Sequence, residues 1–227
     1  MEIVPIAHIR TGFPTKFGIP RQSGLVKDLE GVVVMEPEYR KREAFKGLEA
    51  FSHLWLLWEF SEALRPQWSP TVRPPRLGGN TRMGVFATRS PFRPNPIGLS
   101  SVELVKVDYA APEAPLLHVR GADLMDGTPI YDIKPYLPFT DSHPEASAGF
   151  AGERFSHALE VDFPGELLQR LPEAQRTAAL EILSEDPRPS YQQDPERVYG
   201  FFFAGWEIKF RVEGTQACVL SVEQAGK

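Results

Sequence analysis

The first half of the chain is centred on Ser52-His53-Leu54-Trp55-Leu56-Leu57-Trp58-Glu59-Phe60, in which six of nine residues are large and apolar. So short an apolar run, rich in aromatic residues, is typical of a strand inside a hydrophobic core. Other β-prone runs surround it, separated by glycine and proline: residues 3–10, 31–35, 83–88, 98–107 and 116–120. No long helical pattern lies between these runs, so we predict an antiparallel barrel or sandwich.

The composition changes near residue 141, where the small and polar segment 141–149 indicates a domain boundary. After it, Pro172 begins a predicted helix that ends before Asp186-Pro187. Apolar residues at 206, 208, 210 and 212 alternate with charged ones, and Gly214 lets the chain turn back into 218–220 as a hairpin. We therefore predict a mostly β protein with an α+β C-terminal part. The first domain covers residues 1–140, and a small helix-plus-hairpin domain covers residues 150–227.

The composition, 42% hydrophobic and 24% charged, is ordinary for a globular protein, and 22 prolines indicate many stiff loops. No run of about 18 apolar residues is present, which excludes a membrane-spanning helix. The first residues lack the pattern of a signal peptide, so we expect a cytoplasmic protein without a membrane partner. The lone Cys218 rules out a disulfide within the chain and a thiolate cluster. The five histidines show no paired spacing, so we expect no metal site.

Positive charge is concentrated in one segment of an otherwise acidic chain, whose net charge is −5. Residues 63–102 contain no Asp, Glu or Lys but six arginines, at positions 65, 73, 76, 82, 89 and 93. The remainder carries the other 19 basic residues and all 30 acidic residues. Such a segment predicts a local anion-binding surface, although arginines paired with acidic neighbours elsewhere would give the same pattern.

Two loop segments have the composition of a binding site. Residues 89–98 place two arginines among three prolines, which fix the backbone and lower the cost of ordering the arginines around an anion. Residues 123–138 gather three aspartates, one lysine and two tyrosines around the turn Asp126-Gly127-Thr128-Pro129. Either segment could also be a plain connection. The sequence lacks G-x-G-x-x-G, Walker A and G-x-S-x-G motifs, so these residues indicate a charged small-molecule ligand, with nucleic acid as a second partner, but name no reaction.

Eight segments spread along the chain carry a family resemblance: residues 20–22, 47–55, 73–76, 84–90, 93–98, 126–129, 132–138 and 186–189. They resemble the TrmO (TsaA/YaeB) family of bacterial tRNA methyltransferases, nearly end to end and in the same order. The resemblance implies an S-adenosylmethionine-dependent enzyme without a Rossmann fold, whose N-terminal antiparallel β-barrel binds the cofactor. It also implies a homodimer with cofactor sites near the subunit interface, and a C-terminal domain that helps to hold tRNA. The implied reaction is N6-methylation of N6-threonylcarbamoyladenosine beside the anticodon of threonine tRNA.

The resemblance also implies site residues. Those expected to contact the cofactor are Gln22, Ser23, Gly24, Ser61, Glu62, Arg89, Leu99, Asp126, Gly127, Thr128 and Pro129. By residue type, Arg73, Arg76, Arg93 and Lys134 are the candidates for binding tRNA phosphates or the threonyl carboxylate, with Arg93 or Arg76 favoured for the carboxylate. The candidates for a catalytic base are Asp132, Tyr131 and Tyr136, and the sequence does not decide among them.

Two other classes of protein remain open on the sequence alone. One is a non-catalytic barrel that binds an adenosyl ligand or RNA, and the other is a hydrolase of a modified nucleoside. The full set of loop motifs favours the methyltransferase over both.

Overall fold

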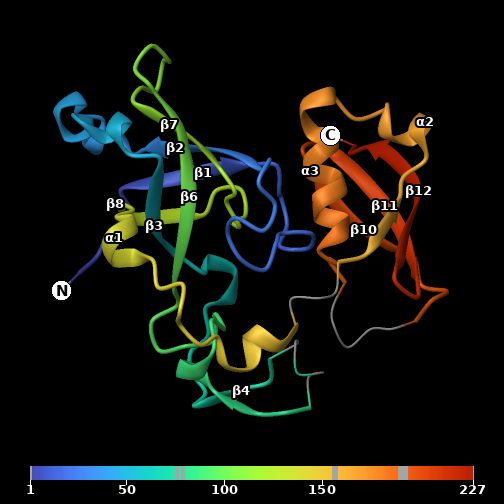
Figure 1. Ribbon diagram of the computed structural model, residues 1–227. Coiled ribbons are helices and arrows are strands. Elements are labelled where there is room, and N and C mark those ends of the chain that lie inside the picture. Colours follow the sequence, from blue (N-terminus) through green and yellow to red (C-terminus); the bar gives the residue numbers. More distant parts are fainter. Residues whose placement is uncertain (1, 75–76, 78–79, 155–157, 189–193, 227) are drawn as a thin grey trace.

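The computed structural model describes residues 2–74, 77, 80–154, 158–188 and 194–226. Strands dominate the fold (Figure 1): β1 Ala7–Thr11, β2 Glu30–Met35, β3 His53–Glu59, β4 Thr71–Val72, β5 Met83–Gly84, β6 Ile97–Asp108, β7 Leu116–Arg120, β8 Pro129–Pro135, β9 Glu160–Asp162, β10 Tyr199–Phe203, β11 Trp206–Glu213 and β12 Gln216–Gln224. The α-helices are α1 Pro138–Asp141, α2 Gly165–Leu168 and α3 Glu173–Ser184. Across the described ranges, no helix combines the length and apolar character that crossing a bilayer requires.

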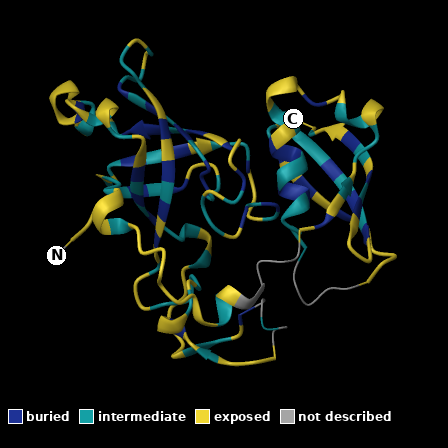
Figure 2. Ribbon diagram, in the orientation of Figure 1, coloured by how far each residue is buried: buried dark blue, intermediate teal, exposed yellow. Residues whose placement is uncertain are grey.

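Six strands close into a barrel in the order β1-β2-β7-β6-β3-β8, with antiparallel neighbours throughout. The predicted central strand is β3, which lies between β6 and β8. Its side chains alternate, so that Leu54, Leu56 and Trp58 are at most 7% exposed while the residues between them are less buried. The barrel is therefore confirmed, and Figure 2 shows buried positions along its strands; Leu54, Leu56 and Trp58 of β3 belong to this buried core.

Two segments differ from the predicted strands. The run 83–88 gives only β5, which pairs with β4 outside the barrel, and then a 3-10 turn over Val85–Ala87. The Val85 amide donates to the Pro70 carbonyl (3.0 Å), which draws this segment away from the barrel. Conversely, the sequence patterns assign no strand to residues 129–135, yet these residues form β8, which closes the barrel between β1 and β3. Prolines at both ends of β8 make the sequence look unlike a strand, because proline is normally excluded from central strands.

The C-terminal part is a four-stranded sheet in the order β10-β11-β12-β9, with α3 packed against it. The predicted helix and the hairpin β11–β12 are confirmed. Strands β10 and β9 extend the hairpin, and β9 runs parallel to β12. On α3, the buried face consists of the alanine and aliphatic positions Ala178, Ala179, Ile182 and Leu183.

The core of this sheet continues into the loop that follows β1. Phe13 lies against Phe203, with ring centroids 5.3 Å apart, and Val26 and Leu29 belong to the same buried cluster. Gly18 has φ +94°, and a Cβ there would come within 2.8 Å of the Phe201 ring. The loop 12–29 is thus held by the C-terminal sheet as well as by the barrel.

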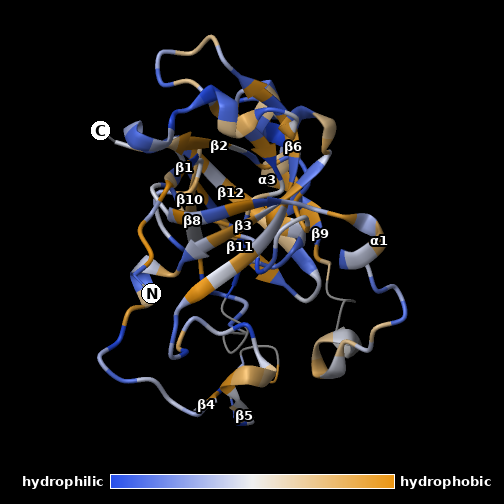
Figure 3. Ribbon diagram, turned by 90° about the vertical axis from the view of Figure 1, so that its left-hand side faces the viewer, coloured by the Kyte–Doolittle hydropathy of each residue, from blue (hydrophilic) through white to orange (hydrophobic). Residues whose placement is uncertain are grey.

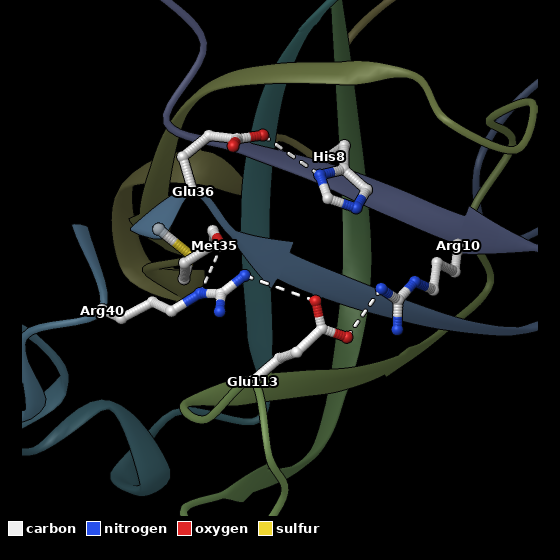
Figure 4. A network of polar contacts seen from close by, with 6 residues as sticks. All are labelled: His8, Arg10, Met35, Glu36, Arg40 and Glu113. Carbon is white, nitrogen blue, oxygen red and sulfur yellow. Dashed lines mark hydrogen bonds and ion pairs between the residues drawn. The ribbon is translucent and has the colours of Figure 1, made fainter. Parts of the chain in front are cut away.

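A polar network fixes the outside of the barrel near β1 and β2 (Figure 4). The carboxylate of Glu113, in the loop between β6 and β7, accepts from Arg10 (2.7 Å) and Arg40 (3.4 Å). Arg40 also donates to the Met35 carbonyl (2.9 Å), so the network joins the end of β2 to this loop. The hydrogen bond from Arg10 holds the pKa of Glu113 below its usual range, so this contribution to stability is present at neutral pH and is lost as the pH falls.

Gly98 gives the first prediction, because it lies opposite Trp58 in the β3–β6 ladder. A Cβ at Gly98 would overlap the indole ring of Trp58, which is 7% exposed. Gly98→Ala should therefore lower the free energy of unfolding by about 1–3 kcal/mol, the usual cost of overpacking. Urea unfolding measures it. Gly84→Ala is the matched control, since a Cβ at Gly84 meets nothing within 4 Å; equal stability of the two variants would refute the steric argument.

Candidate functional site

Three loops meet at one end of the barrel and bring together residues far apart in the sequence. The Gly24 amide donates to the Gly121 carbonyl (2.9 Å), which joins the loop after β1 to the β7–β8 loop. The Ser101 amide of β6 donates to Ser23 Oγ (3.1 Å). The Arg89 guanidinium donates to the side-chain carbonyl of Gln22. Four of the residues expected to contact the cofactor therefore lie in one hydrogen-bonded cluster.

A buried chain of side chains lies beneath these loops. Trp58 Nε1 donates to Ser100 Oγ (2.9 Å), and this hydroxyl donates to Asp123 Oδ1 (2.5 Å). Burial raises the pKa of Asp123, while the hydrogen bonds from Ser100 and Ser23 and the nearby Arg89 charge oppose that rise. Asp123 thus connects the barrel core to the loop cluster.

Sequence reasoning did not assign Asp123 to the site, although it belongs to the acidic segment 123–138. Its burial depends on Ser100 and Ser23, which approach it only in the folded chain. The sequence signal for its burial is its position directly before the apolar Leu124, whose side chain is 1% exposed in the structure.

The turn 126–129 is fixed to β1. Asp126 Oδ1 accepts from the Thr11 amide (2.9 Å), and the Gly127 amide donates to the Ile9 carbonyl (2.8 Å). Thr128 is 3% exposed, and its hydroxyl donates to the Met125 carbonyl (2.7 Å). Pro129 pairs with His8 at the start of β8. The Asp126 carboxylate remains exposed at the surface and keeps free lone pairs for a ligand.

The remaining residues expected to contact the cofactor lie beside these loops. Leu99 is 54% exposed on β6. Ser61 and Glu62 form a 3-10 turn directly after β3, and the Phe60 amide before them donates to the Pro96 carbonyl (2.9 Å). That bond places this turn against the proline-rich loop that follows Arg89.

The outer face of β6, β3 and β8 carries the candidates for a catalytic base. Leu57 is the register partner of both Leu99 and Asp132, so these two residues flank it on one face of the sheet. Lys134 lies two residues further on β8, and its Nζ is 2.8 Å from Asp132 Oδ2. Asp132 and Lys134 therefore form an ion pair on the face that also carries Leu99.

The two tyrosines are engaged differently. Tyr131 lies at the irregularity in the β3–β8 ladder, and burial followed by its hydrogen bond to Glu59 raises its pKa. The Tyr136 ring lies 5.5 Å from that of Trp55 and 6.2 Å from that of His53. The raised pKa keeps the Tyr131 hydroxyl protonated at neutral pH.

The arginine segment divides into different environments. Arg93 donates to the carbonyls of Thr88 (3.0 Å) and Ser90 (3.4 Å), so it braces its own loop. The Arg65 guanidinium lies 3.6 Å from the centroid of the Phe92 ring, and Arg73 is exposed. Arg76 lies outside the described residues. Among those that the structure does describe, no ion pair within 4.0 Å joins an arginine of residues 63–102 to a carboxylate.

Asp123 gives a pH prediction. A carboxyl group whose pKa is raised on folding contributes most stability below its unfolded pKa of about 3.8, and that contribution is lost as the pH rises through the folded pKa. The stability of Asp123→Asn relative to the natural protein should therefore increase as the pH rises above about 4. Urea unfolding at several pH values measures this difference. The exposed Asp28→Asn is the control, and parallel curves for all three proteins would contradict the prediction.

Comparison with known proteins places the chain in a family. Residues 8–142 match the model of the tRNA-methyltransferase O N-terminal domain, and residues 156–225 match that of the TrmO C-terminal domain. The chain is 43% identical over 226 residues to the tRNA (adenine(37)-N6)-methyltransferase of Escherichia coli, covering 96% of each chain. It is 41% identical over 207 residues to a Pseudomonas aeruginosa protein whose name proposes an S-adenosylmethionine-dependent methyltransferase, covering 88% of this chain and 87% of that one.

A crystal structure of TrmO from P. aeruginosa superimposes with a TM-score of 0.80 at 33% identity, covering 99% of this chain and 97% of that one. By sequence and by fold, the chain belongs to the TrmO family.

Proposed function

We propose that this protein transfers a methyl group from S-adenosylmethionine to N6 of adenosine 37 in tRNA. We further propose that the substrate is the N6-threonylcarbamoyl form of that adenosine in threonine tRNA. The observation that carries the proposal is the meeting of three loops at one barrel end, directly beside an arginine segment that lacks acidic residues. The names of the E. coli and P. aeruginosa relatives support the reaction class and the cofactor.

The loop residues fit the cofactor by charge. Arg89 suits a carboxylate, the exposed Asp126 carboxylate suits an ammonium or sulfonium group, and the exposed Leu99 offers apolar contact to an adenine ring. Gln22 holds Arg89 in place by a hydrogen bond. The next two residues, Ser23 and Gly24, are small, so a ligand can approach their backbone. When bound, S-adenosylmethionine supplies an electrophilic methyl group. The contribution of these loops is to hold the reactants in line, and positioning of this kind can supply most of the acceleration.

The target nitrogen belongs to a ureido group, which is a weak nucleophile, so a group that removes its proton increases the rate. Asp132 is the best placed of the three candidates. It lies on the face of Leu99, whereas the Tyr131 hydroxyl is bonded to Glu59. We assign Asp132 as the proton acceptor.

Lys134 connects substrate recognition to this base. Its ammonium group is paired with Asp132 in the free protein, at 2.8 Å. A threonyl carboxylate that binds Lys134 competes with Asp132 for this ammonium group, so substrate binding frees the Asp132 carboxylate to accept a proton. Because Arg93 is bonded to its own loop, Lys134 is favoured over Arg93 for the carboxylate, and Arg73 is left for phosphate.

The proposal extends to the oligomeric state and to the roles of the two parts of the chain. We propose a cytoplasmic homodimer with a cofactor-binding domain over residues 1–140 and a domain over residues 150–227 that assists tRNA binding. The attachment of the loop 12–29 to the C-terminal sheet supports a shared role, because this loop also carries Gln22, Ser23 and Gly24.

The central test is methyl incorporation from labelled S-adenosylmethionine into tRNA that carries threonylcarbamoyladenosine but lacks the methyl group. Asp132→Asn should lower kcat about 100-fold or more, because it removes the proton acceptor, with little change in cofactor affinity. Asp162→Asn, on the exposed strand β9, is the control. Cofactor binding without any methyl incorporation by the natural protein would instead indicate a non-catalytic binding barrel.

Substitutions of basic residues should separate the two kinds of anion. Lys134→Ala should reduce affinity for threonylcarbamoylated tRNA far more than for unmodified tRNA, because only the former carries the carboxylate. Arg73→Ala should weaken both and reduce the slope of log Kd against log salt by about one. Affinities at several salt concentrations measure both effects. If the two variants weaken both tRNAs by one common factor, the carboxylate is bound elsewhere.

A further inference from the structure

A cavity lies next to the loop cluster, between residues 63–68 and 91–96. Its volume is about 610 Å³, which lies in the range expected for small-ligand sites. Its described walls include Leu64, Arg65, Trp68, Phe92 and Pro96. The residues assigned above to the cofactor are absent from these walls, so the cavity is a separate place in the structure.

The rim of this cavity exposes aromatic side chains. Trp68 is 51% exposed and Phe86 is 74% exposed, and their ring centroids lie 6.2 Å apart. Phe86 belongs to the 3-10 turn after β5, and Figure 3 shows a hydrophobic turn beside β4 and β5 at the lower end of the molecule. Exposed aromatic rings gathered in one place indicate a surface that binds a partner.

Another part of the lining offers a second flat surface. The Arg65 guanidinium lies over the Phe92 ring at 3.6 Å, so the planar cation and the ring form one stack. Pro91 directly before Phe92 and Pro94 two residues after it fix their own φ angles, which stiffens the loop that carries this ring. The cavity thus combines indole, phenyl and guanidinium planes, which are the groups on which unpaired nucleobases stack.

Charge decides between RNA and a second copy of the chain as the occupant. Residues 63–102 contain six arginines and no acidic residue. In a two-fold symmetric dimer centred on this patch, each copy would present its arginines to those of the other. An RNA loop provides phosphates for the arginines and flat bases for the rings.

We propose that Trp68 and the Arg65–Phe92 stack form a base-stacking site for an unpaired nucleotide of the anticodon loop, next to the target adenosine. This inference rests on the proposed function, because it takes tRNA as the substrate. It adds a specific contact to the electrostatic attraction of the arginine segment. The site holds the loop open at a neighbouring base while the target reaches the Asp132 face.

The test uses the full-length protein and a fluorescently labelled RNA stem–loop with the anticodon-loop sequence, without cofactor. Trp68→Ala should weaken binding about tenfold or more, whereas Trp68→Phe, which keeps an aromatic plane, should stay within about threefold of the natural protein. Arg65→Ala should also weaken binding. Phe202→Ala, a partly exposed aromatic residue on β10, is the matched control and should bind normally. Equal affinities for all four variants would overturn the proposal.

Tryptophan fluorescence identifies the contact directly. The RNA should quench the tryptophan fluorescence of the natural protein, and the degree of quenching should be smaller in Trp68→Phe. S-adenosylmethionine alone should cause no quenching that depends on Trp68. Quenching by the cofactor alone would overturn the proposal in favour of a cofactor pocket. Loss of a dimer in Trp68→Ala by light scattering, with unchanged RNA affinity, would overturn it in favour of a second copy. Neither readout requires methyl transfer, so failure of this proposal and failure of the proposed function are distinguishable.

Discussion

The close packing of the Trp58 indole on Gly98 is the constraint on which the end of the barrel depends. Because residue 98 has no side chain, the ring can lie flat across the β3–β6 ladder and direct its Nε1 to Ser100. Ser100 in turn donates to Asp123, whose partners include Ser23 and Arg89. The close contact between β3 and β6 thus positions Trp58, Ser100 and Asp123 in turn, and Asp123 holds the loops that surround the site.

The arrangement separates support from contact. Side chains beneath the loops are buried and fully engaged with one another, whereas Leu99, Asp126 and Lys134 are exposed above them. Such a division suits a site that must hold two reactants in line, because the exposed groups are positioned by a framework that does not itself need to move. The stiff, proline-rich loop after Arg89 serves the same end, since Arg93 is bonded to its carbonyls.

Sequence patterns predicted the parts of this structure that local chemistry determines. The aromatic run at β3 and the alternation in β11 have strict burial consequences, and both strands form as expected. Strand β8 could not be predicted, because prolines at its ends disfavour a strand and only its neighbours β1 and β3 make pairing favourable. The roles of the individual arginines could not be predicted either. Nothing in the local sequence distinguishes Arg93, which donates to carbonyls of its own loop, from Arg65, which stacks on Phe92.

The shared core between the loop 12–29 and the C-terminal sheet has a consequence for how this architecture can be recombined. Phe13, Val26 and Leu29 share a buried cluster with residues of the C-terminal sheet at least 130 positions away in the sequence, and the Ala204 amide donates to the Gly12 carbonyl at 2.7 Å. The C-terminal sheet is therefore not an interchangeable module. A chimera that exchanges this sheet for a relative's must exchange residues 12–29 as well, because the two segments share one buried core although they lie near opposite ends of the chain.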